Sequence, residues 1–566
     1  MIKYLKKNGN FALYLILFCV IAYLATLGYR GLISPDETRY AEIPREMLLT
    51  GDWITPKMND LVFFEKPIFA YWLSAVNMLI FGVNAFAARL GSALMTLIAT
   101  CGVWFFVKKT FKNDFLSVLS AAIFASMGIV FGIGTFVVLD AQFSGFMTLG
   151  MIFFYMLYKS KGKMDFFTYS VLCGLSFGCA FLTKGFVIFI LAGGAATLFL
   201  LWEKEYKKIF TLPWLPFFVM LLVAVPWSLA MLKADAGFWH HFIIEEHIGR
   251  FLSKFRENSN DASNKHEEPF WFFIPVVLIG ILPWGIHLWT IIKGVAKKDF
   301  SDSRIRFLIC WFGVVVVFFS LSSGKLPTYI LPCFAPLAML VGYWLNKSLN
   351  ENNIKTFNIV NKILLVLFSI AAVAATVYTG TVLTNFCPTI YGKGELFKYP
   401  MIILVFALCV TFLYLCVKNS DVHEKLKYFF IAFAVIFMVA NLAAPNKFLY
   451  NKAQGQFILE NAQEIPEDAT VIAYSNMIFA VNYYLERKDI GIYARMGNFG
   501  YALNRDQKLK EKRFYSVEKL EKLIADKSRT KKIVLFRSIK EKRLDSKLPK
   551  GYIKMIRTGD LTMAIY

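Results

Sequence analysis

The stretch Ser34-Pro-Asp-Glu-Thr-Arg-Tyr-Ala-Glu-Ile-Pro-Arg-Glu-Met47 is rich in carboxylates and lies between two apolar blocks of the chain. The block before it is Phe11–Gly28, and the block after it is Pro67–Gly82. Because charged side chains are costly in the hydrocarbon core of a bilayer, the stretch predicts a polar segment between membrane-embedded parts. It also marks a place where chemistry can occur at a membrane surface.

The composition predicts a polytopic α-helical membrane protein. Of the 566 residues, 57% are hydrophobic, 17% are aromatic and only 18% are charged, which excludes a water-soluble globule for most of the chain. The net charge of +23 does not indicate nucleic acid as a partner, because many of the basic residues lie in short loops between apolar runs and are not gathered on one soluble face. The nine cysteines lie mostly inside apolar segments and read as small buried hydrophobes.

The loop charges predict the topology. A span needs about 20 apolar residues, and cytoplasmic loops carry an excess of lysine and arginine. Lys3, Lys6 and Lys7 therefore place the N-terminus in the cytoplasm, and treating Pro67–Gly82 as an interfacial or re-entrant helix keeps the basic cluster at 108–112 cytoplasmic too. About thirteen crossings remain. They are expected near 11–28, 87–107, 115–133, 141–158, 165–183, 186–202, 210–230, 271–292, 305–322, 327–345, 361–382, 400–417 and 427–445.

This topology predicts two domains, a transmembrane domain over 1–445 and a soluble α/β domain over 446–566. The transmembrane domain would place its loops 29–66 and 231–270 on the outer face, together with the second domain. After Asn446 the apolar runs shorten to strand length, as in Ala469–Tyr474 and Lys532–Arg537, with the amphipathic stretch Val517–Ala525 between them.

Three carboxylates stand out on the predicted outer face. Asp36 and Glu37 follow Pro35 soon after the end of a span, and Asp36 is also placed to cap a helix over Glu37–Leu49. Asp140 is a lone carboxylate that follows an apolar run at the same face. Because a carboxylate at membrane depth is costly, Asp140 favours a functional interpretation of the group.

Four cations lie near span edges on the same predicted face: Lys66, Lys184, Arg250 and Lys325. A single lysine or arginine at a span edge is typical of an interfacial anchor. The orientation rule disfavours cations in short outer loops, so the four together predict a site for an anionic headgroup. Arginine can contact phosphate oxygens in pairs and lysine acts as a point charge, which indicates a lipid phosphate.

A metal site is a weaker prediction. The segment 238–251 carries His240, His241, Glu246 and His247, and a solvated interfacial helix is the preferred interpretation. Metal binding needs several converging ligands, and Glu65 with His247 is the one pair retained for a divalent ion.

Motifs spread from residue 35 to 329 carry a family resemblance. They are Pro35-Asp-Glu-Thr-Arg-Tyr-Ala-Glu, Arg45-Glu-Met47, Gly51-Asp-Trp53, Phe64-Glu-Lys-Pro67, Leu139-Asp140, Leu182-Thr-Lys-Gly185, Glu246-His247, Arg250-Phe251 and Gly324-Lys-Leu-Pro-Thr-Tyr329. In this order they resemble the bacterial lipid A aminoarabinose transferases of the glycosyltransferase-C (GT-C) group, which includes protein O-mannosyltransferases. The 253–268 stretch has no counterpart among these motifs.

The resemblance implies a GT-C fold and transfer of an aminosugar from undecaprenyl phosphate to a lipid A phosphate. The enzyme would act as a monomer at the periplasmic face of the inner membrane, lower the surface negative charge and favour polymyxin resistance. Asp36 and Asp140 would be the catalytic residues. The implied substrate-binding residues are Glu37, Glu65, Lys66, Lys184, Arg250, Lys325 and Tyr329.

Three alternatives remain open at this point. No short motif distinguishes aminoarabinose from a hexosamine such as galactosamine. A protein O-glycosyltransferase would share the fold and the donor. A lipid transporter would place polar residues near the bilayer midplane and show repeats, whereas the charges here gather at one edge.

Overall fold

The computed structural model describes residues 10–249, 268–322, 324–351, 353–384, 386–474, 476–526, 528–538 and 548–566. The chain forms two compact units. The first, here called the membrane unit, comprises the residues up to Leu27 and Leu90–Ala443; the second, called the sheet unit, comprises Gly28–Arg89 and Ala444–Tyr566. The segment 28–89 thus folds with the C-terminal part, whereas the sequence placed 29–66 as a loop of the domain 1–445.

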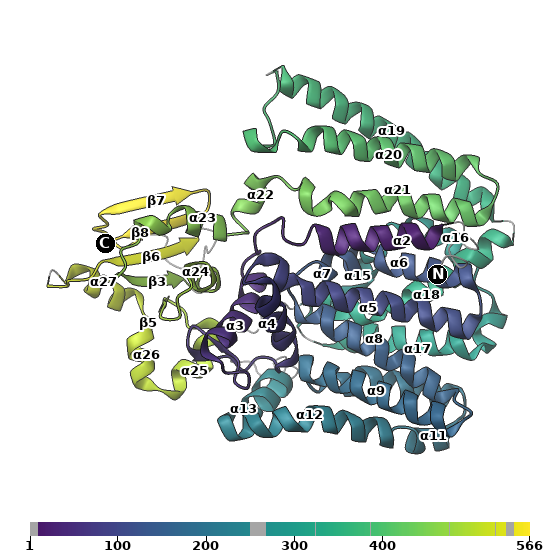
Figure 1. Ribbon diagram of the computed structural model, residues 1–566, viewed down its shortest axis with the longest axis horizontal. Helices are drawn as coiled ribbons and strands as arrows, with labels where there is room; N and C mark the ends of the chain where they lie inside the picture. Colours follow the sequence, from purple (N-terminus) through teal and green to yellow (C-terminus); the bar gives the residue numbers. More distant parts are fainter. Residues whose placement is uncertain are drawn as a thin grey trace. The chain divides into compact units, whose positions relative to one another are not determined.

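Long apolar helices make up most of the membrane unit (Figure 1). Within the described ranges, nine helical segments are long and apolar enough to cross a membrane. They are α5 (Ala85–Phe111), α8 (Leu139–Tyr158), α9 (Lys163–Lys184), α11 with α12 (Tyr206–Thr211 and Trp214–Ala234), α17 (Ser303–Leu321), η8 with α18 (Pro327–Cys333 and Phe334–Asn350), α19 (Ile354–Leu383), α20 (Lys398–Lys418) and α21 (Val422–Ala443).

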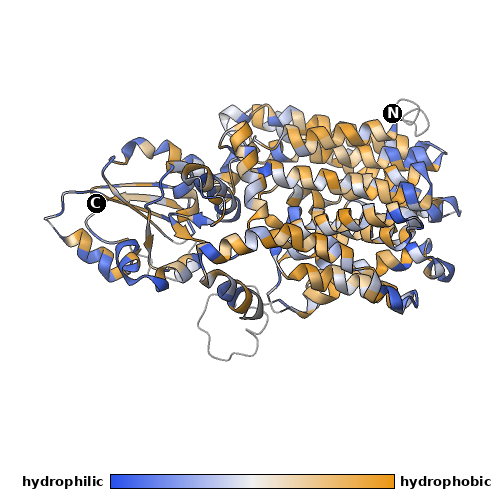
Figure 2. Cartoon of the chain, turned by 60° about the horizontal axis from the view of Figure 1, so that its bottom comes forward, coloured by the Kyte–Doolittle hydropathy of each residue, from blue (hydrophilic) through white to orange (hydrophobic). Residues whose placement is uncertain are grey.

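Two bent helix pairs raise the number of candidate spans in the described residues to eleven at most, fewer than the thirteen crossings that the sequence predicted, and shorter apolar helices occupy the two remaining positions. α6 (Asp114–Ala125) and α7 (Gly128–Gly134) meet at 63°, and α15 (Phe273–Gly280) meets the segment Trp284–Lys293, formed by η6 and α16, at 99°. Phe11–Ala25 (α2 and η1) and Phe189–Trp202 (η2 and α10) are shorter. Each of the predicted spans falls on one of these helices or pairs, and hydrophilic residues gather near the helix ends (Figure 2).

Close packing of α9 on α12 explains two glycines four residues apart. A Cβ at Gly174 would lie 2.4 Å from the carbonyl oxygen of Pro216, and a Cβ at Gly178 would lie 2.7 Å from the Cβ of Val223. Small residues at this spacing share one helix face and let two membrane helices approach closely. The backbone of α9, which carries Lys184, is thereby held against its neighbour.

The N-terminal part of the sheet unit contains α3 (Asp36–Thr50), the strands β1 (Lys57–Met58) and β2 (Leu61–Val62), and α4 (Phe69–Phe81). At 1.5 Å per residue α4 is about 20 Å long, too short for a hydrocarbon core of about 30 Å. This length agrees with the interfacial or re-entrant helix that the loop charges predicted.

The C-terminal part of the sheet unit is a six-stranded sheet of order β5-β4-β3-β6-β8-β7. The strands β5, β4, β3 and β6 are parallel to one another, and β8 pairs antiparallel with both of its neighbours, β6 and β7. The strands are β3 (Thr470–Tyr474), β4 (Gly491–Tyr493), β5 (Phe514–Tyr515), β6 (Ile533–Ser538), β7 (Lys554–Thr558) and β8 (Leu561–Ile565). The helices are α22 (Asn446–Tyr450), α23 (Gly455–Glu460), α24 (Ile478–Leu485), α25 (Gly500–Arg505), α26 (Gln507–Arg513) and α27 (Val517–Ala525). The predicted α/β domain, including its helix over Val517–Ala525, is confirmed.

A buried asparagine joins the two parts of the sheet unit. Asn59 lies at the two-residue turn between β1 and β2 with a φ of +59°, in the left-handed region that this turn requires. It is fully buried, its Nδ2 donates to the carbonyl of Ile490 at 2.8 Å, and its Oδ1 accepts from the amide of Ile490 and from Nδ2 of Asn482, each at 2.9 Å. Since buried polar groups need partners, this turn is fixed on the C-terminal sheet.

Candidate functional site

Most of the described site residues fall into two groups, one in each unit. The Asp140 cluster, in the membrane unit, comprises Asp140, Lys184 and Tyr329. The Asp36 cluster, in the sheet unit, comprises Asp36, Arg39, Glu65, Lys66 and Asn498.

Asp140 and Lys184 form an ion pair at the ends of two packed helices. Asp140 lies in the first turn of α8, and Lys184 is the last residue of α9. α9 ends there because Gly185 adopts a φ of +81°. An acid at a helix N-terminus and a base at a helix C-terminus each complement the helix dipole. The side chains are only 16% and 12% exposed, so the pair is shielded from water.

Tyr329 completes the Asp140 cluster through its ring. Nζ of Lys184 lies 4.6 Å from the Tyr329 ring centroid and 5.4 Å from that of Phe143, within the range of cation–π attraction. Tyr329 lies in η8, the segment that follows Lys325. The structure thus brings together three predicted residues that are up to 189 positions apart in the sequence.

Lys325 is held differently from Lys184. It is 3% exposed, and its ammonium donates to the carbonyls of Ser322 at 2.6 Å and Glu268 at 2.9 Å. These backbone contacts fix the turn that leads into η8, and they direct the ammonium to protein oxygens.

Asp36 begins α3 and pairs with an arginine one turn later. Pro35 occupies the N-cap position without a side-chain hydrogen bond, so the capping role considered for Asp36 is wrong. The side chain of Asp36 is 51% exposed, and its Oδ1 accepts from Nη2 of Arg39 at 2.7 Å. Nη1 of Arg39 lies 3.8 Å from Oε2 of Glu65, so this arginine connects the two acids.

Glu65 and Lys66 are anchored from the C-terminal part of the sheet unit. Nδ2 of Asn498, in η11 (Gly497–Phe499), donates to Oε1 of Glu65. Nζ of Lys66 donates to the carbonyl of Glu65 at 2.9 Å. The rings of Phe64 and Tyr501 lie 5.5 Å apart and hold the same segment.

Glu37 is a buried structural group. It is fully buried, and its carboxylate accepts from Nε and Nη2 of Arg89 at 2.7 Å, from Nη1 of Arg30 at 2.6 Å and from the amide of Ile33 at 2.8 Å. Burial alone raises the pKa of a carboxyl, but the two arginines outweigh it and lower the pKa of Glu37. Glu37 has no exposed surface, and these contacts hold the start of α3.

Two predicted residues lie outside what the structure describes: Arg250 and the side chain of His247. The helix predicted around them is present over Gly237–Gly249, formed by α13 (Gly237–His240) and η3 (His241–Gly249). In the described part of the chain, no group of three or more histidine, cysteine, aspartate or glutamate side chains is placed to hold a metal ion. The neighbours of Glu65 named above, an arginine and an amide N–H, are donors rather than metal ligands.

Sequence reasoning gave no role to Arg39 or Asn498. Arg39 is part of the opening motif, and its position three residues after Asp36 in a predicted helix was a usable signal for an ion pair. Asn498 is 433 positions from Glu65, and no local pattern connects them.

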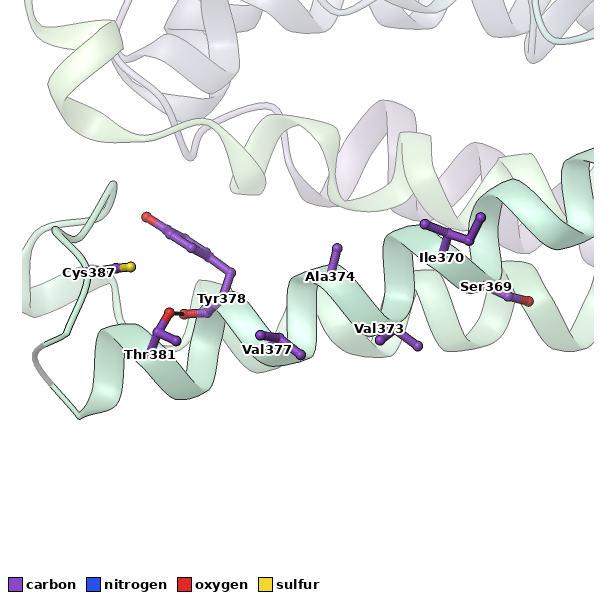
Figure 3. A pocket seen from close by; sticks show the side chains of 8 residues that line it. All are labelled: Ser369, Ile370, Val373, Ala374, Val377, Tyr378, Thr381 and Cys387. Atoms are coloured by element: carbon purple, nitrogen blue, oxygen red, sulfur yellow. Dashed lines mark hydrogen bonds between the residues drawn. The ribbon is translucent and has the colours of Figure 1, made fainter.

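A separate cavity of about 710 Å³ lies along α19. Figure 3 shows its lining, with Tyr378 and Thr381 near one end and aliphatic side chains such as Ile370 along the helix. The lining contains no acid or base. This cavity therefore offers apolar contact and is not a site for the chemistry of charged headgroups.

Comparisons with known proteins agree with this architecture. Residues 11–242 match the family model described as dolichyl-phosphate-mannose-protein mannosyltransferase, and residues 449–565 match the C-terminal domain of the arabinosyl transferase ArnT. The chain is 31% identical over 564 residues to the undecaprenyl phosphate-alpha-4-amino-4-deoxy-L-arabinose arabinosyl transferase of Shewanella sediminis, with 99% of each chain covered. It is 33% identical over 87% of each chain to the corresponding transferase 2 of Proteus mirabilis.

The fold is also that of a solved structure. The crystal structure of ArnT from Cupriavidus metallidurans bound to undecaprenyl phosphate superposes with a TM-score of 0.76 at 20% identity, covering 97% of both chains. This superposition shows that the chain has the GT-C fold. With the relatives above, the chain is an integral-membrane glycosyltransferase. Within that class, the chain belongs to the family of undecaprenyl phosphate-alpha-4-amino-4-deoxy-L-arabinose arabinosyl transferases, so the resemblance carried by its motifs is confirmed. It is a multi-pass protein of the bacterial inner membrane.

Proposed function

We propose that the protein transfers 4-amino-4-deoxy-L-arabinose from undecaprenyl phosphate to a phosphate group of lipid A at the periplasmic face of the inner membrane. The observation that carries this proposal is the full-length relationship to a transferase named for that donor, which covers 99% of both chains. Transfer would add an ammonium group to lipid A, reduce its negative charge and favour resistance to polymyxin.

The proposed reaction exchanges one phosphate ester for another. An oxygen of the acceptor phosphate attacks the anomeric carbon of the sugar, and the bond from that carbon to the undecaprenyl phosphate oxygen breaks. The leaving phosphate takes the electron pair. Because the acceptor is already ionised near neutral pH, positioning and charge stabilisation matter more than a strong base.

The described clusters supply the groups that this reaction needs. Lys184 presents an ammonium at a span end, where it can stabilise a phosphate as a point charge. Asp140, its partner, and the half-exposed Asp36 can each accept from the sugar's hydroxyl or ammonium groups. We assign Lys66 and Arg250 to the leaving phosphate, Tyr329 and Lys325 to the walls of the headgroup site, and Glu65 to the sugar's ammonium group. We assign Glu37 to positioning α3.

Mass spectrometry of lipid A tests the proposed reaction. We expect cells that carry the gene to contain phosphate-linked aminoarabinose, and cells without it, or with Asp36→Asn, to lack it. Asp468→Asn is the matched control, because Asp468 is an exposed aspartate of the same unit. Lipid A that is identical in all strains, at equal protein levels, would contradict the proposal.

A protein O-glycosyltransferase is the second candidate, and the mannosyltransferase match over residues 11–242 favours it. The same strains distinguish the two, because this enzyme would produce glycopeptides that depend on the gene. A different mass on lipid A, as from galactosamine, would identify another sugar with the same acceptor.

Asn498 provides a test of how Glu65 is held. Asn498→Asp keeps the side-chain size but faces Glu65 with a second carboxylate in place of an N–H donor. We expect the transfer rate in membranes to fall roughly tenfold, the value of a lost charge-assisted hydrogen bond of about 1.5 kcal/mol. Asn498→Gln retains the donor and is expected to keep more of the rate.

The readout for Asn498 separates positioning from folding. If Glu65 contacts the sugar's ammonium group, Asn498→Asp changes the KM for the donor while the protein elutes and melts like the wild type. Equal rates for Asn498→Asp and wild type would show that Asn498 does not position Glu65.

A further inference from the structure

A polar cavity of about 410 Å³ lies at the far ends of the helices that carry Asp140 and Lys184. On α8, Asp140 is in the first turn and Tyr155 is near the last; on α9, Tyr169 is near the start and Lys184 is the last residue. At 1.5 Å per residue, each pair is separated by about 22 Å along its helix. The cavity therefore belongs to the other end of the membrane unit and is distinct from the Asp140 cluster.

Four helix ends form this cavity. Lys109 comes from the end of α5, Tyr155 and Lys159 from the end of α8, Tyr169 from the start of α9, and Arg304 from the start of α17. Its volume lies in the range of about 300–1,000 Å³ that is usual for sites of small ligands and headgroups.

One wall of the cavity is an internal ion pair. Nε of Arg304 lies 2.9 and 3.0 Å from the two carboxylate oxygens of Asp302, and Nη1 donates to the carbonyl of Thr110 at 2.9 Å. The bond to Thr110 connects α17 to α5. Since Asp302 and Arg304 carry opposite charges, the pair adds no net charge to the cavity.

Two lysines give the cavity its positive charge. Nζ of Lys159 lies 4.6 Å from the ring centroid of Tyr158, and Nζ of Lys109 lies 5.9 Å from that of Tyr169. Among the described residues, no carboxylate lies within salt-bridge distance of either ammonium. Asp165 is the one other acid in the lining, and it is exposed. Asp302, which Arg304 holds, also attracts Lys159 electrostatically. The lining thus carries three basic residues (Lys109, Lys159 and Arg304) and two acidic ones (Asp165 and Asp302), which leaves one net positive charge.

We propose that this cavity binds the phosphoryl headgroup of an anionic membrane lipid. Two ammonium groups at the rim would contact the phosphate oxygens as point charges, and the tyrosine rings below them would pack against the glycerol. Basic residues beside a membrane attract anionic lipids. All four lysines Lys109, Lys159, Lys161 and Lys163 are exposed, but only Lys109 and Lys159 line the cavity.

Native mass spectrometry of the purified full-length protein tests this proposal. The protein is titrated with phosphatidylglycerol and, separately, with zwitterionic phosphatidylcholine. We expect the double variant Lys109→Gln/Lys159→Gln to bind phosphatidylglycerol about 25-fold more weakly, from roughly fivefold for each lysine. The matched control, Lys161→Gln/Lys163→Gln, removes the same charge outside the cavity and is expected to bind like the wild type.

Three results would overturn the proposal. Equal weakening by the control pair would mean that only net charge matters, and equal affinity for phosphatidylcholine would remove the role of anionic charge. Displacement of the lipid by an equal concentration of glycerol 3-phosphate would assign the cavity to a free phosphate ester instead. The experiment uses neither donor nor acceptor, so its outcome is independent of the proposed transfer reaction.

Discussion

Glu37→Gln is expected to destabilise the protein by about 3–5 kcal/mol, the usual cost of breaking a buried ion pair. The amide keeps the shape of the side chain but leaves the guanidinium groups of Arg89 and Arg30, with side chains 1% and 9% exposed, without a counter-charge. We expect the variant to accumulate poorly, and the purified fraction to lose its monodisperse gel-filtration peak at a lower temperature than the wild type.

The control for Glu37 is Glu467→Gln, which makes the same chemical change at an exposed position of the same unit. A Glu37→Gln variant as heat-resistant as this control would contradict the structural role of the ion pair. The pH dependence has a definite sign. Because the pKa of Glu37 is lowered from 4.5, its stabilising contribution is fully present above about pH 4.5 and is lost as the pH falls through the lower folded-state value.

Lys184→Met is expected to lower the transfer rate roughly 100- to 1,000-fold, the range seen when one preorganised charge-stabilising donor is removed. Methionine retains the apolar stem that packs against Phe143 and Tyr329 but removes the ammonium. It also leaves Asp140 without its partner at the start of α8. The measurement is transfer of the sugar to lipid A in membranes that contain equal amounts of each protein.

Lys233→Met is the matched control for Lys184. Lys233 also lies in the last turn of a membrane-spanning helix, α12, and its side chain is exposed. Full activity in Lys233→Met together with loss in Lys184→Met would separate the ion pair from the general effect of a helix-end cation. Full activity in Lys184→Met would exclude Lys184 from the chemistry.

Hydropathy and loop charge predicted much of the fold. A span buries its backbone hydrogen bonds within one segment, so a local count of apolar residues suffices to find it. The strands around Thr470–Tyr474 and Ile533–Ser538 were predicted for the same reason, because their residues are apolar along a short run. The bends between α6 and α7 and after α15 were missed, since both halves of each pair are equally apolar.

The assembly of the sheet unit could not be predicted from such patterns. Hydrogen bonds between distant segments join Asn59 to Asn482 and Ile490. A hydropathy pattern does not predict which distant residues form such bonds. For the same reason the sequence could not show that two arginines enclose Glu37, a residue predicted to bind substrate. The sequence placed Asp140 and Lys184 each at the end of a predicted span. It could not predict their contact, because that contact depends on how α8 and α9 pack.

The two segments of the sheet unit are separated by about 350 residues of the chain. The partners of Asn59 and Glu65 lie 423 to 433 residues further along the chain. At a synthesis rate of about 5–20 residues per second, they leave the ribosome roughly 20–85 seconds after these residues do. During that interval the membrane helices are inserted, and the carboxylate-rich segment 34–47 is already synthesised although the strands of the C-terminal sheet are not. A chain that terminates before Asn498 therefore carries Asp36 and Glu65 but lacks a residue that holds Glu65, so the Asp36 cluster can form only late in translation.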